Sequence, residues 1–274
     1  MRLLHSDVDL ERFFHGVGRA PERVLFLDYD GTLAPFHPDP LLAVPYPGIP
    51  ERLRALTLGE ATRVVIVSGR PLEELRTLIE LLGHHEAWGA HGWESYRPGG
   101  EVTRHAPEEA AVRRLALAEE SVRRLEEEGA RLERKLASVA MHWRGLPEAQ
   151  ARALGERIVK AWEEIADANV ELLPFEGGIE LRARGRNKAH AVREVLARSA
   201  PDAACAYLGD DITDEDAFDE IRPRGLAVLV APELRRTAAD LWLRPPRELE
   251  WFLERWAAAA DGGCGRELRS RGPE

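Results

Sequence analysis

Short apolar segments that end abruptly in polar residues are the feature of this sequence that most constrains its fold. Three of them, at 23–27, 63–67 and 203–208, lead directly into Asp28, Ser68 and the pair Gly209-Asp210. Segments of this length and composition are typical of buried parallel strands. In an open parallel sheet, sites form outside the carboxyl ends of the strands. The sequence therefore predicts an α/β fold with a mainly parallel sheet, in which Asp28, Ser68 and Asp210 share one crevice.

The middle of the chain has a different pattern from its two ends. Near the ends we expect helices at 50–57, 71–82, 187–198 and 246–257, and a further strand at 226–230. In the middle, charged helices at 107–128 and 147–165 alternate with two hairpins, which pair 131–135 with 138–144 and 170–174 with 178–183. This order predicts a Rossmann-like core made of 1–103 and 185–274, with an α+β domain inserted at 104–184. The Gly- and Arg-rich residues 261–274 are expected to form a mobile tail.

The composition excludes several classes of protein. The 274 residues carry a formal net charge of −10, which argues against non-specific binding to nucleic acid. No apolar run approaches the roughly 20 residues that cross a bilayer, and the N-terminus lacks the apolar segment of a signal peptide. Only two cysteines are present. We therefore expect a reduced, cytoplasmic protein with no membrane or nucleic-acid partner and no obligate protein partner.

Two carboxylates, Asp28 and Asp30, follow the first strand at a spacing of two residues. One can attack a phosphorus atom, while the other protonates the leaving oxygen and later deprotonates water. Gly31 allows a sharp turn, and Thr32 offers a hydroxyl and an amide to phosphate oxygens. The alternative is an Asp-x-Asp-Gly turn that merely ends a strand.

A dense acidic cluster from Gly209 to Asp216 follows another of the strands. Hard carboxylate oxygens suit Mg²⁺, which takes one or two carboxylates together with waters and substrate phosphate. We expect Asp210 and Asp211 to serve the metal, and Asp214 to orient loop amides or Lys188. The alternative is an acidic helix N-terminus, which the helix dipole favours.

Two further groups suit an anionic ligand. Ser68-Gly69-Arg70 precedes a helix, where a hydroxyl and free amides can hold phosphate, although an ordinary loop would look the same. Lys188 begins a helix after Asn187. If it is buried, it would offset the charge of the carboxylates and the phosphate; otherwise it is a surface residue.

The order of these motifs resembles that of the haloacid dehalogenase superfamily of phosphatases. Its four motifs read Asp-x-Asp-Gly-Thr, Ser, Lys and Gly-Asp-Asp-x-x-x-Asp, and the insertion lies where that superfamily places its larger, C2B-type cap. Within the superfamily, the sequence is similar to the trehalose-6-phosphate phosphatase family. The segments that carry this likeness are 28–35, 209–218, Ala90-His91-Gly92 and the pattern Lys135-x-x-Ser138-x-Ala140-x-His142-x-Arg144.

The inserted domain also has a pattern that suits a sugar. Alternation along 138–144 places Ser138, Ala140, His142 and Arg144 on one face of a strand and the apolar residues on the other. Glu180 and Arg182 extend the polar face, unless it is an ordinary solvated surface. Together with the resemblance, this pattern predicts these substrate-binding residues: Gly69, Arg70, His91, Gly92, Lys135, His142, Arg144 and Glu180.

The sequence departs from the family pattern at two places. The family usually has a Gly-Lys pair where this chain has Gly177-Gly178, and a proline where it has Ala183. The missing lysine removes one expected contact to the sugar or the phosphate.

The resemblance implies that the chain hydrolyses trehalose 6-phosphate, as a step of trehalose biosynthesis, by the following mechanism. Mg²⁺ is held by Asp28, the carbonyl of Asp30 and Asp210, Asp28 attacks the phosphate, and Asp30 acts as acid and then base. Ser68 and Lys188 stabilise the transferring group, and the cap closes over the sugar. The alternatives are a phosphatase of another sugar phosphate and a non-catalytic sugar-phosphate-binding homologue. In each case the expected ligand is a small sugar phosphate.

Overall fold

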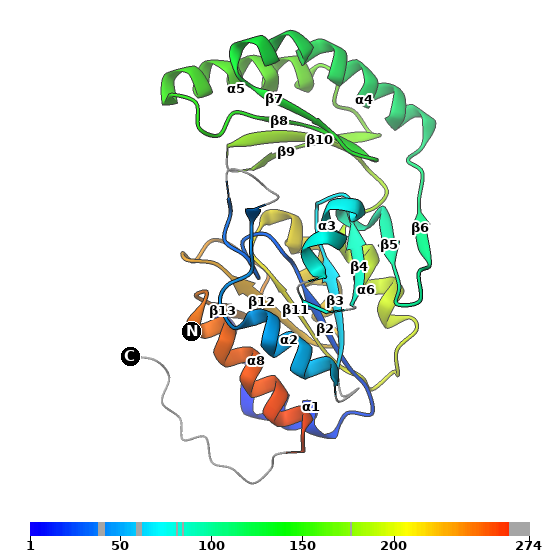
Figure 1. Ribbon diagram of the computed structural model, residues 1–274, viewed down its shortest axis with the longest axis vertical. Coiled ribbons are helices and arrows are strands. Elements are labelled where there is room, and N and C mark those ends of the chain that lie inside the picture. The colour runs from blue at the N-terminus through cyan, green and yellow to red at the C-terminus, as the bar shows by residue number, and fades with distance from the viewer. Residues whose placement is uncertain (38–41, 59–61, 81, 84, 176, 263–274) are drawn as a thin grey trace. The chain divides into compact units, whose positions relative to one another are not determined.

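The computed structural model describes residues 1–37, 42–58, 62–80, 82–83, 85–175 and 177–262. They form two compact units, which are coloured by residue number in Figure 1. The larger contains Met1–Thr103 and the residues from Asn187 onward, and the smaller contains Arg104–Arg186. The expected tail at 261–274 lies, from residue 263 on, outside the described residues. No helix within the described ranges is long and apolar enough to cross a membrane.

The larger unit is built on one mainly parallel sheet. Its described strands lie in the order β1-β13-β12-β11-β2-β3-β4-β5-β6, of which β13 to β4 run parallel and β1 and β5 pair antiparallel at the two sides. The bounds of these strands are β1 Arg2–Leu3, β2 Arg23–Leu27, β3 Arg63–Val67, β4 Glu86–Gly89, β5 Glu94–Tyr96, β6 Val102–Arg104, β11 Ala204–Gly209, β12 Leu226–Val230 and β13 Leu241–Leu243.

Helices cover both faces of this sheet. Leu25 and Leu27 of β2 join a core with the apolar residues of α1 (Leu10–Arg19), α2 (Ile49–Leu58), α3 (Leu72–Ile79) and α8 (Arg247–Ala260). Val24 and Phe26, which alternate with them, pack with α6 (Lys188–Leu196) and α7 (Glu215–Ile221). Because both faces are covered, β2 is apolar and buried from Val24 to Leu27, as the sequence pattern predicts.

The smaller unit is an antiparallel sheet with two helices on one face. Its strands lie in the order β7 (Arg131–Arg134), β8 (Ser138–His142), β10 (Gly178–Ala183) and β9 (Val170–Phe175). Helices α4 (Glu109–Val122) and α5 (Glu148–Glu163) contact β10, and α4 also contacts β8. Val139 and Met141 are buried, as alternation along β8 predicts.

Most elements agree with the sequence prediction, and the differences have local causes. Helix α1 was not predicted, although its apolar residues Leu10, Phe13, Phe14 and Val17 have helical spacing and Asp9 caps its first turn. The helix expected at 107–128 is wrong in its last turns: α4 ends at Val122, and a 3₁₀ turn (Arg123–Glu128) leads to Gly129, whose φ is 95°. Helix α3 ends at Ile79, before the predicted Leu82.

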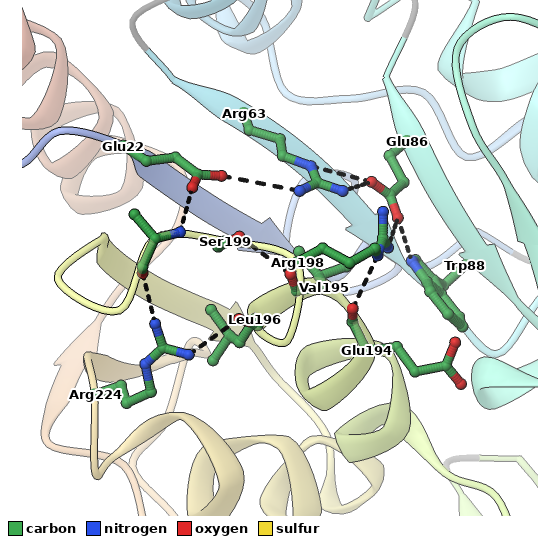
Figure 2. A network of polar contacts seen from close by, with 11 residues as sticks. Glu22, Arg63, Glu86, Trp88, Glu194, Val195, Leu196, Arg198, Ser199 and Arg224 are labelled. Carbon is green, nitrogen blue, oxygen red and sulfur yellow. Dashed lines mark hydrogen bonds and ion pairs between the residues drawn. The ribbon is translucent and has the colours of Figure 1, made fainter.

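A buried carboxylate ties three elements together at the amino-terminal side of the sheet. Glu86, only 4% exposed, accepts hydrogen bonds from the Trp88 indole at 3.0 Å and from Arg198 at 2.8 Å. Its other oxygen accepts from Arg63 of β3, as Figure 2 shows. Burial opposes ionisation of Glu86, but Arg198 and Arg63 outweigh it and lower the pKa of this carboxyl below its usual value. The network therefore joins β3, β4 and the end of α6.

Replacing Glu86 with glutamine should lower the free energy of unfolding by about 2–3 kcal/mol, because hydrogen bonds to a charged group are lost in a buried place. Urea denaturation of both proteins measures this difference. Since the folded-state pKa of Glu86 is lowered, its contribution exists above pH 4.5 and is lost as the pH falls below that value. The control Glu220→Gln removes the exposed pair with Arg193 and should cost less than about 1 kcal/mol. Equal losses in the two variants would contradict the role of Glu86.

Candidate active site

A buried lysine lies between two buried carboxylates at the carboxyl edge of the sheet. The Lys188 ammonium donates to Asp28 Oδ1 at 2.8 Å and to Asp214 Oδ1 at 2.7 Å. Asp28 follows β2, Lys188 begins α6, and Asp214 ends the 3₁₀ turn Ile212–Asp214. Burial works to lower the pKa of Lys188, but Asp214 and Asp28 outweigh it and hold the pKa above its usual value. Lys188 therefore stays a cation and fixes the direction of the Asp28 carboxylate.

Asp214 holds Lys188 in place and accepts three further hydrogen bonds from neighbouring residues of the core. Its Oδ1 also accepts from the Tyr207 hydroxyl at 2.6 Å, and its Oδ2 accepts from the amides of Asp210 and Asp211 at 3.1 and 3.0 Å. The Asp211 side chain caps the turn by accepting from the amide of Ile212. Asp214 thus orders both the loop and Lys188.

Asp210 has an unsatisfied buried oxygen. Its Oδ1 has no hydrogen-bond partner among the described residues. Oxygens of Asp28, Asp210 and Asp214 lie within 4.8 Å of one another. Burial, followed by the charge of Asp28 and Asp214, raises the pKa of Asp210 well above its usual value. Three carboxylates against one lysine leave an excess of negative charge, which a divalent cation with oxygen ligands would neutralise.

The turn after β2 is shaped by the close approach of Asp210. Gly31 has φ 79°, and a Cβ atom there would lie 2.0 Å from Asp210 Oδ2. Only glycine fits this position. The Thr32 hydroxyl lies 3.4 Å from Asp28 Oδ2, so the turn also supports the second oxygen of Asp28. Burial raises the pKa of Asp28 to about 7 against the opposing effect of Lys188, and a cation beside it would favour the charged form.

Asp30 is held by an arginine that follows β3. Arg70 Nε donates to Asp30 Oδ2 at 2.6 Å, and Arg70 Nη2 donates to Oδ1 at 2.5 Å. We expected Arg70 to bind substrate, and the structure pairs it with the second carboxylate of the motif. No pattern in the sequence links these two residues, which lie 40 positions apart.

The loop after β4 packs against the loop after β3. Ser68 is buried, its carbonyl accepts from the amide of His91 at 3.0 Å, and its hydroxyl accepts from the amide of Arg70 at 3.2 Å. A Cβ atom on Gly69 would lie 2.6 Å from the His91 ring. Ala90 and His91 have φ of 49° and 54°, which is uncommon outside glycine and clusters at functional sites. Gly92 lies beside the carbonyl of Asn187, just before Lys188.

In the smaller unit, the polar face of the sheet carries a second cluster of charges. Buried Glu180 accepts from the Ser138 hydroxyl at 2.6 Å and from Lys135 at 3.2 Å. His142 pairs with Glu133 at 2.6 Å. Burial acts to raise the pKa of Glu133, but the hydrogen bond from His142 and the charge of Lys135 lower it to about 2.

The strand prediction for this face needs one correction. Strand β8 ends at His142, two residues before the predicted end; the amide of Trp143 makes one more bond, to the carbonyl of Gly177, and the φ of 78° at Gly177 then turns the partner segment away. Arg144 is therefore an exposed residue of the following turn.

Sequence reasoning missed three residues at these sites. They are Tyr207, which donates to Asp214, Glu133, which pairs with His142, and Arg235. The Nε and Nη2 atoms of Arg235 donate to the carbonyls of Asp210 and Asp211 at 3.1 and 2.7 Å. Arg235 follows β12, so the rule that polar residues after strands gather at one edge could have found it. Tyr207 lies inside an apolar strand and gave no such signal.

Comparisons with known proteins show the family of this chain. The family model described as trehalose-phosphatase matches residues 26–240. The chain belongs to the trehalose-phosphatase family. A Mycobacterium ulcerans protein named trehalose-phosphate phosphatase is 31% identical over 256 residues, which cover 87% of this chain and 62% of the relative. The Arabidopsis thaliana trehalose-phosphate phosphatase B is 30% identical, with 85% and 65% covered. The chain thus spans about three-fifths of the length of these curated relatives.

The fold of this trehalose-phosphatase family member also matches solved structures. The C-terminal domain of Candida albicans trehalose-6-phosphate phosphatase superposes with a TM-score of 0.77 at 22% identity, covering 95% of this chain and 99% of that one. A trehalose-6-phosphate phosphatase related protein gives 0.63 at 24% identity, with 88% and 99% covered. The predicted mainly parallel α/β core with an inserted α+β domain is therefore confirmed as the fold.

Proposed function

We propose that this chain hydrolyses trehalose 6-phosphate to trehalose and inorganic phosphate in a magnesium-dependent reaction, as a step of trehalose biosynthesis. The observation that carries the proposal is the buried Lys188, which orients Asp28 beside the unsatisfied oxygen of Asp210. The names of the relatives support the choice of substrate.

Asp28 is the proposed nucleophile. One oxygen of its carboxylate bonds to phosphorus while the bond from phosphorus to the sugar 6-oxygen breaks, which leaves an aspartyl-phosphate. Asp30 gives a proton to the departing sugar oxygen. Water then attacks the phosphorus, Asp30 takes the water proton, and the bond between Asp28 and phosphorus breaks to release phosphate. The Asp28 and Asp30 motif lies at one turn, so both groups can reach the same phosphoryl group.

The remaining core residues stabilise the transferring group. Lys188 supplies a fixed positive charge, and Ser68 supplies a hydroxyl at the end of β3. Mg²⁺ would be held by Asp28, Asp210 and the carbonyl of Asp30, where it would offset the phosphate charge that repels the Asp28 carboxylate. Asp211 and Asp214 keep these ligands in place through the loop hydrogen bonds described above.

The substrate contacts are assigned to two groups of residues. In the core we propose the loop residues that meet around Ser68, namely Gly69, His91 and Gly92, whereas Arg70, which the sequence also assigned to the substrate, is paired with Asp30 instead. On the polar face of the cap sheet we propose donors and acceptors for the sugar hydroxyls, namely Lys135, His142, Arg144 and Glu180. Glu180 is already ordered by Ser138 and Lys135, and a group fixed before binding discriminates between ligands at a lower entropic cost.

A panel of sugar phosphates tests the proposed function. Phosphate release from trehalose 6-phosphate should exceed that from sucrose, mannosyl and glucose phosphates by about 10²-fold or more in kcat/KM, because a site that pairs hydroxyls penalises ligands that leave those groups unpaired. Chelation of the metal with EDTA should abolish release, and added Mg²⁺ should restore it. Equal rates on all the sugars would show a general sugar phosphatase, and tight binding without release would show a non-catalytic homologue.

A further inference from the structure

The Arg70 guanidinium grips both oxygens of Asp30. Two N–H groups donate in parallel, at 2.6 and 2.5 Å, and the two side chains are 10% and 24% exposed. A bidentate pair fixes the plane of a carboxylate as well as its position, which a single lysine-type contact does not. The carboxyl of Asp30 therefore has one direction in the structure.

Arg70 is itself fixed by its surroundings. Its guanidinium carbon lies 5.6 Å from the centre of the Tyr29 ring, and the Tyr29 hydroxyl is anchored on the carbonyl of Ala43 at 2.8 Å. Its backbone carbonyl accepts from the amide of Ala90 at 2.6 Å. A Cβ atom on Gly89 would lie 2.9 Å from that carbonyl, so the two loops meet with no space between them. The direction given to Asp30 thus comes from a rigid frame made of β2, β3 and β4.

We propose that Arg70 is a positioning residue that aims the Asp30 carboxyl at the leaving oxygen. The inference rests on the proposed function, in which Asp30 gives its proton to that oxygen while the phosphorus–oxygen bond breaks. A proton-transfer group must lie within hydrogen-bond reach of its target, and a displacement of about 1 Å can cost about 10²-fold in rate. Direct contact between Arg70 and the phosphate is the alternative role.

The two roles differ in how they depend on the leaving group. An aryl alcohol departs as a stable anion and needs no proton, whereas a sugar or alkyl alcohol must be protonated as it departs. If Arg70 aims Asp30, then its loss should slow only the second kind of substrate. If Arg70 binds the phosphate, its loss should slow both kinds equally, because the phosphate is common to them.

The test is the turnover of Arg70→Met with a series of phosphomonoesters, from p-nitrophenyl phosphate to simple alkyl and sugar phosphates. We expect kcat for the alkyl and sugar esters to fall by about 10²-fold, and kcat for the aryl ester to change by less than about threefold. Methionine keeps the unbranched stem beside the Tyr29 ring. Arg70→Lys keeps the charge but not the two parallel N–H donors, so its kcat for the alkyl and sugar esters should lie between those of the wild type and Arg70→Met.

A double-mutant cycle gives a second readout. In the Asp30→Asn background, Arg70→Met should lower kcat for alkyl esters by less than about twofold, since the group that it positions is gone. Arg76→Ala is the matched control: Arg76 lies on the next turns of α3, 4.9 Å from the centre of the Tyr96 ring, and its loss should leave every rate unchanged.

An equal loss with every leaving group, or an equal loss in both backgrounds, would overturn the positioning role. Circular dichroism checks that the variants are folded; if Arg70→Met is not, Arg70→Lys and Arg70→Gln carry the same comparison. The wild-type rates report separately on the proposed function. Failure on trehalose 6-phosphate alone would leave the Arg70 inference standing, and a wild type with no activity toward any ester would overturn both.

Discussion

Asp28→Asn should reduce phosphate release from trehalose 6-phosphate by a factor on the order of 10⁴ to 10⁶, the range found when a group of the catalytic centre is removed. The amide of asparagine has nearly the shape of the carboxylate, but it carries no charge and cannot form the bond to phosphorus. Lys188 keeps its second partner, Asp214, so the buried ammonium is still neutralised. We therefore expect a folded and inactive protein.

The measurement is kcat in a phosphate-release assay, combined with urea denaturation to show that the variant is folded. Asp219→Asn is the control, because Asp219 is an exposed residue of α7, and this variant should retain full activity. If Asp28→Asn keeps more than about a tenth of the wild-type rate, far above the residual activity of a missing nucleophile, then Asp28 is not the nucleophile.

Lys188→Met should damage both stability and activity. The variant leaves Asp28 and Asp214 as neighbouring buried carboxylates without their counter-charge. Removing one partner of a buried ion pair costs about 3–5 kcal/mol. The loss of a fixed charge at the transferring group should lower kcat by about 10²- to 10³-fold as well. Methionine fills a similar volume, so the effect comes from the charge and not from a cavity.

Urea denaturation and phosphate release measure these two losses separately, at a temperature where the variant is folded. Lys160→Met, an exposed position on α5, should change the free energy of unfolding by less than about 0.5 kcal/mol and leave kcat unchanged. A Lys188→Met protein as stable as the control would mean that the lysine does not balance the buried carboxylates.

The positions of strands and helices were easier to predict from the sequence than the contacts between their side chains. The buried strands were recognisable because both of their faces are apolar, and β2, β3 and β12 have the predicted bounds. Strand ends then placed Asp28, Ser68 and Asp210 at one edge. The rule concerns strand ends alone, so it said nothing of Tyr207, whose hydroxyl reaches Asp214 from within β11.

Partnerships between distant residues were beyond prediction from one sequence. Lys188 and Asp28 lie 160 positions apart, and their contact depends on how α6 packs across the sheet. Arg70 was assigned to substrate because it directly precedes a helix, yet the direction of its side chain depends on the Tyr29 ring and the loop after β4. In the cap, alternation predicted the two faces of β8, while its last residue depended on the turn at Gly177.

Rapid acid quenching of the wild-type protein with phosphate-labelled trehalose 6-phosphate and Mg²⁺ tests the central claim most directly, because it reports substrate and nucleophile together. Peptide mapping by mass spectrometry should find one phosphoryl group on Asp28 within the first turnover, and none in Asp28→Asn. A label on another residue, or steady phosphate release without any labelled Asp28, would contradict the proposal.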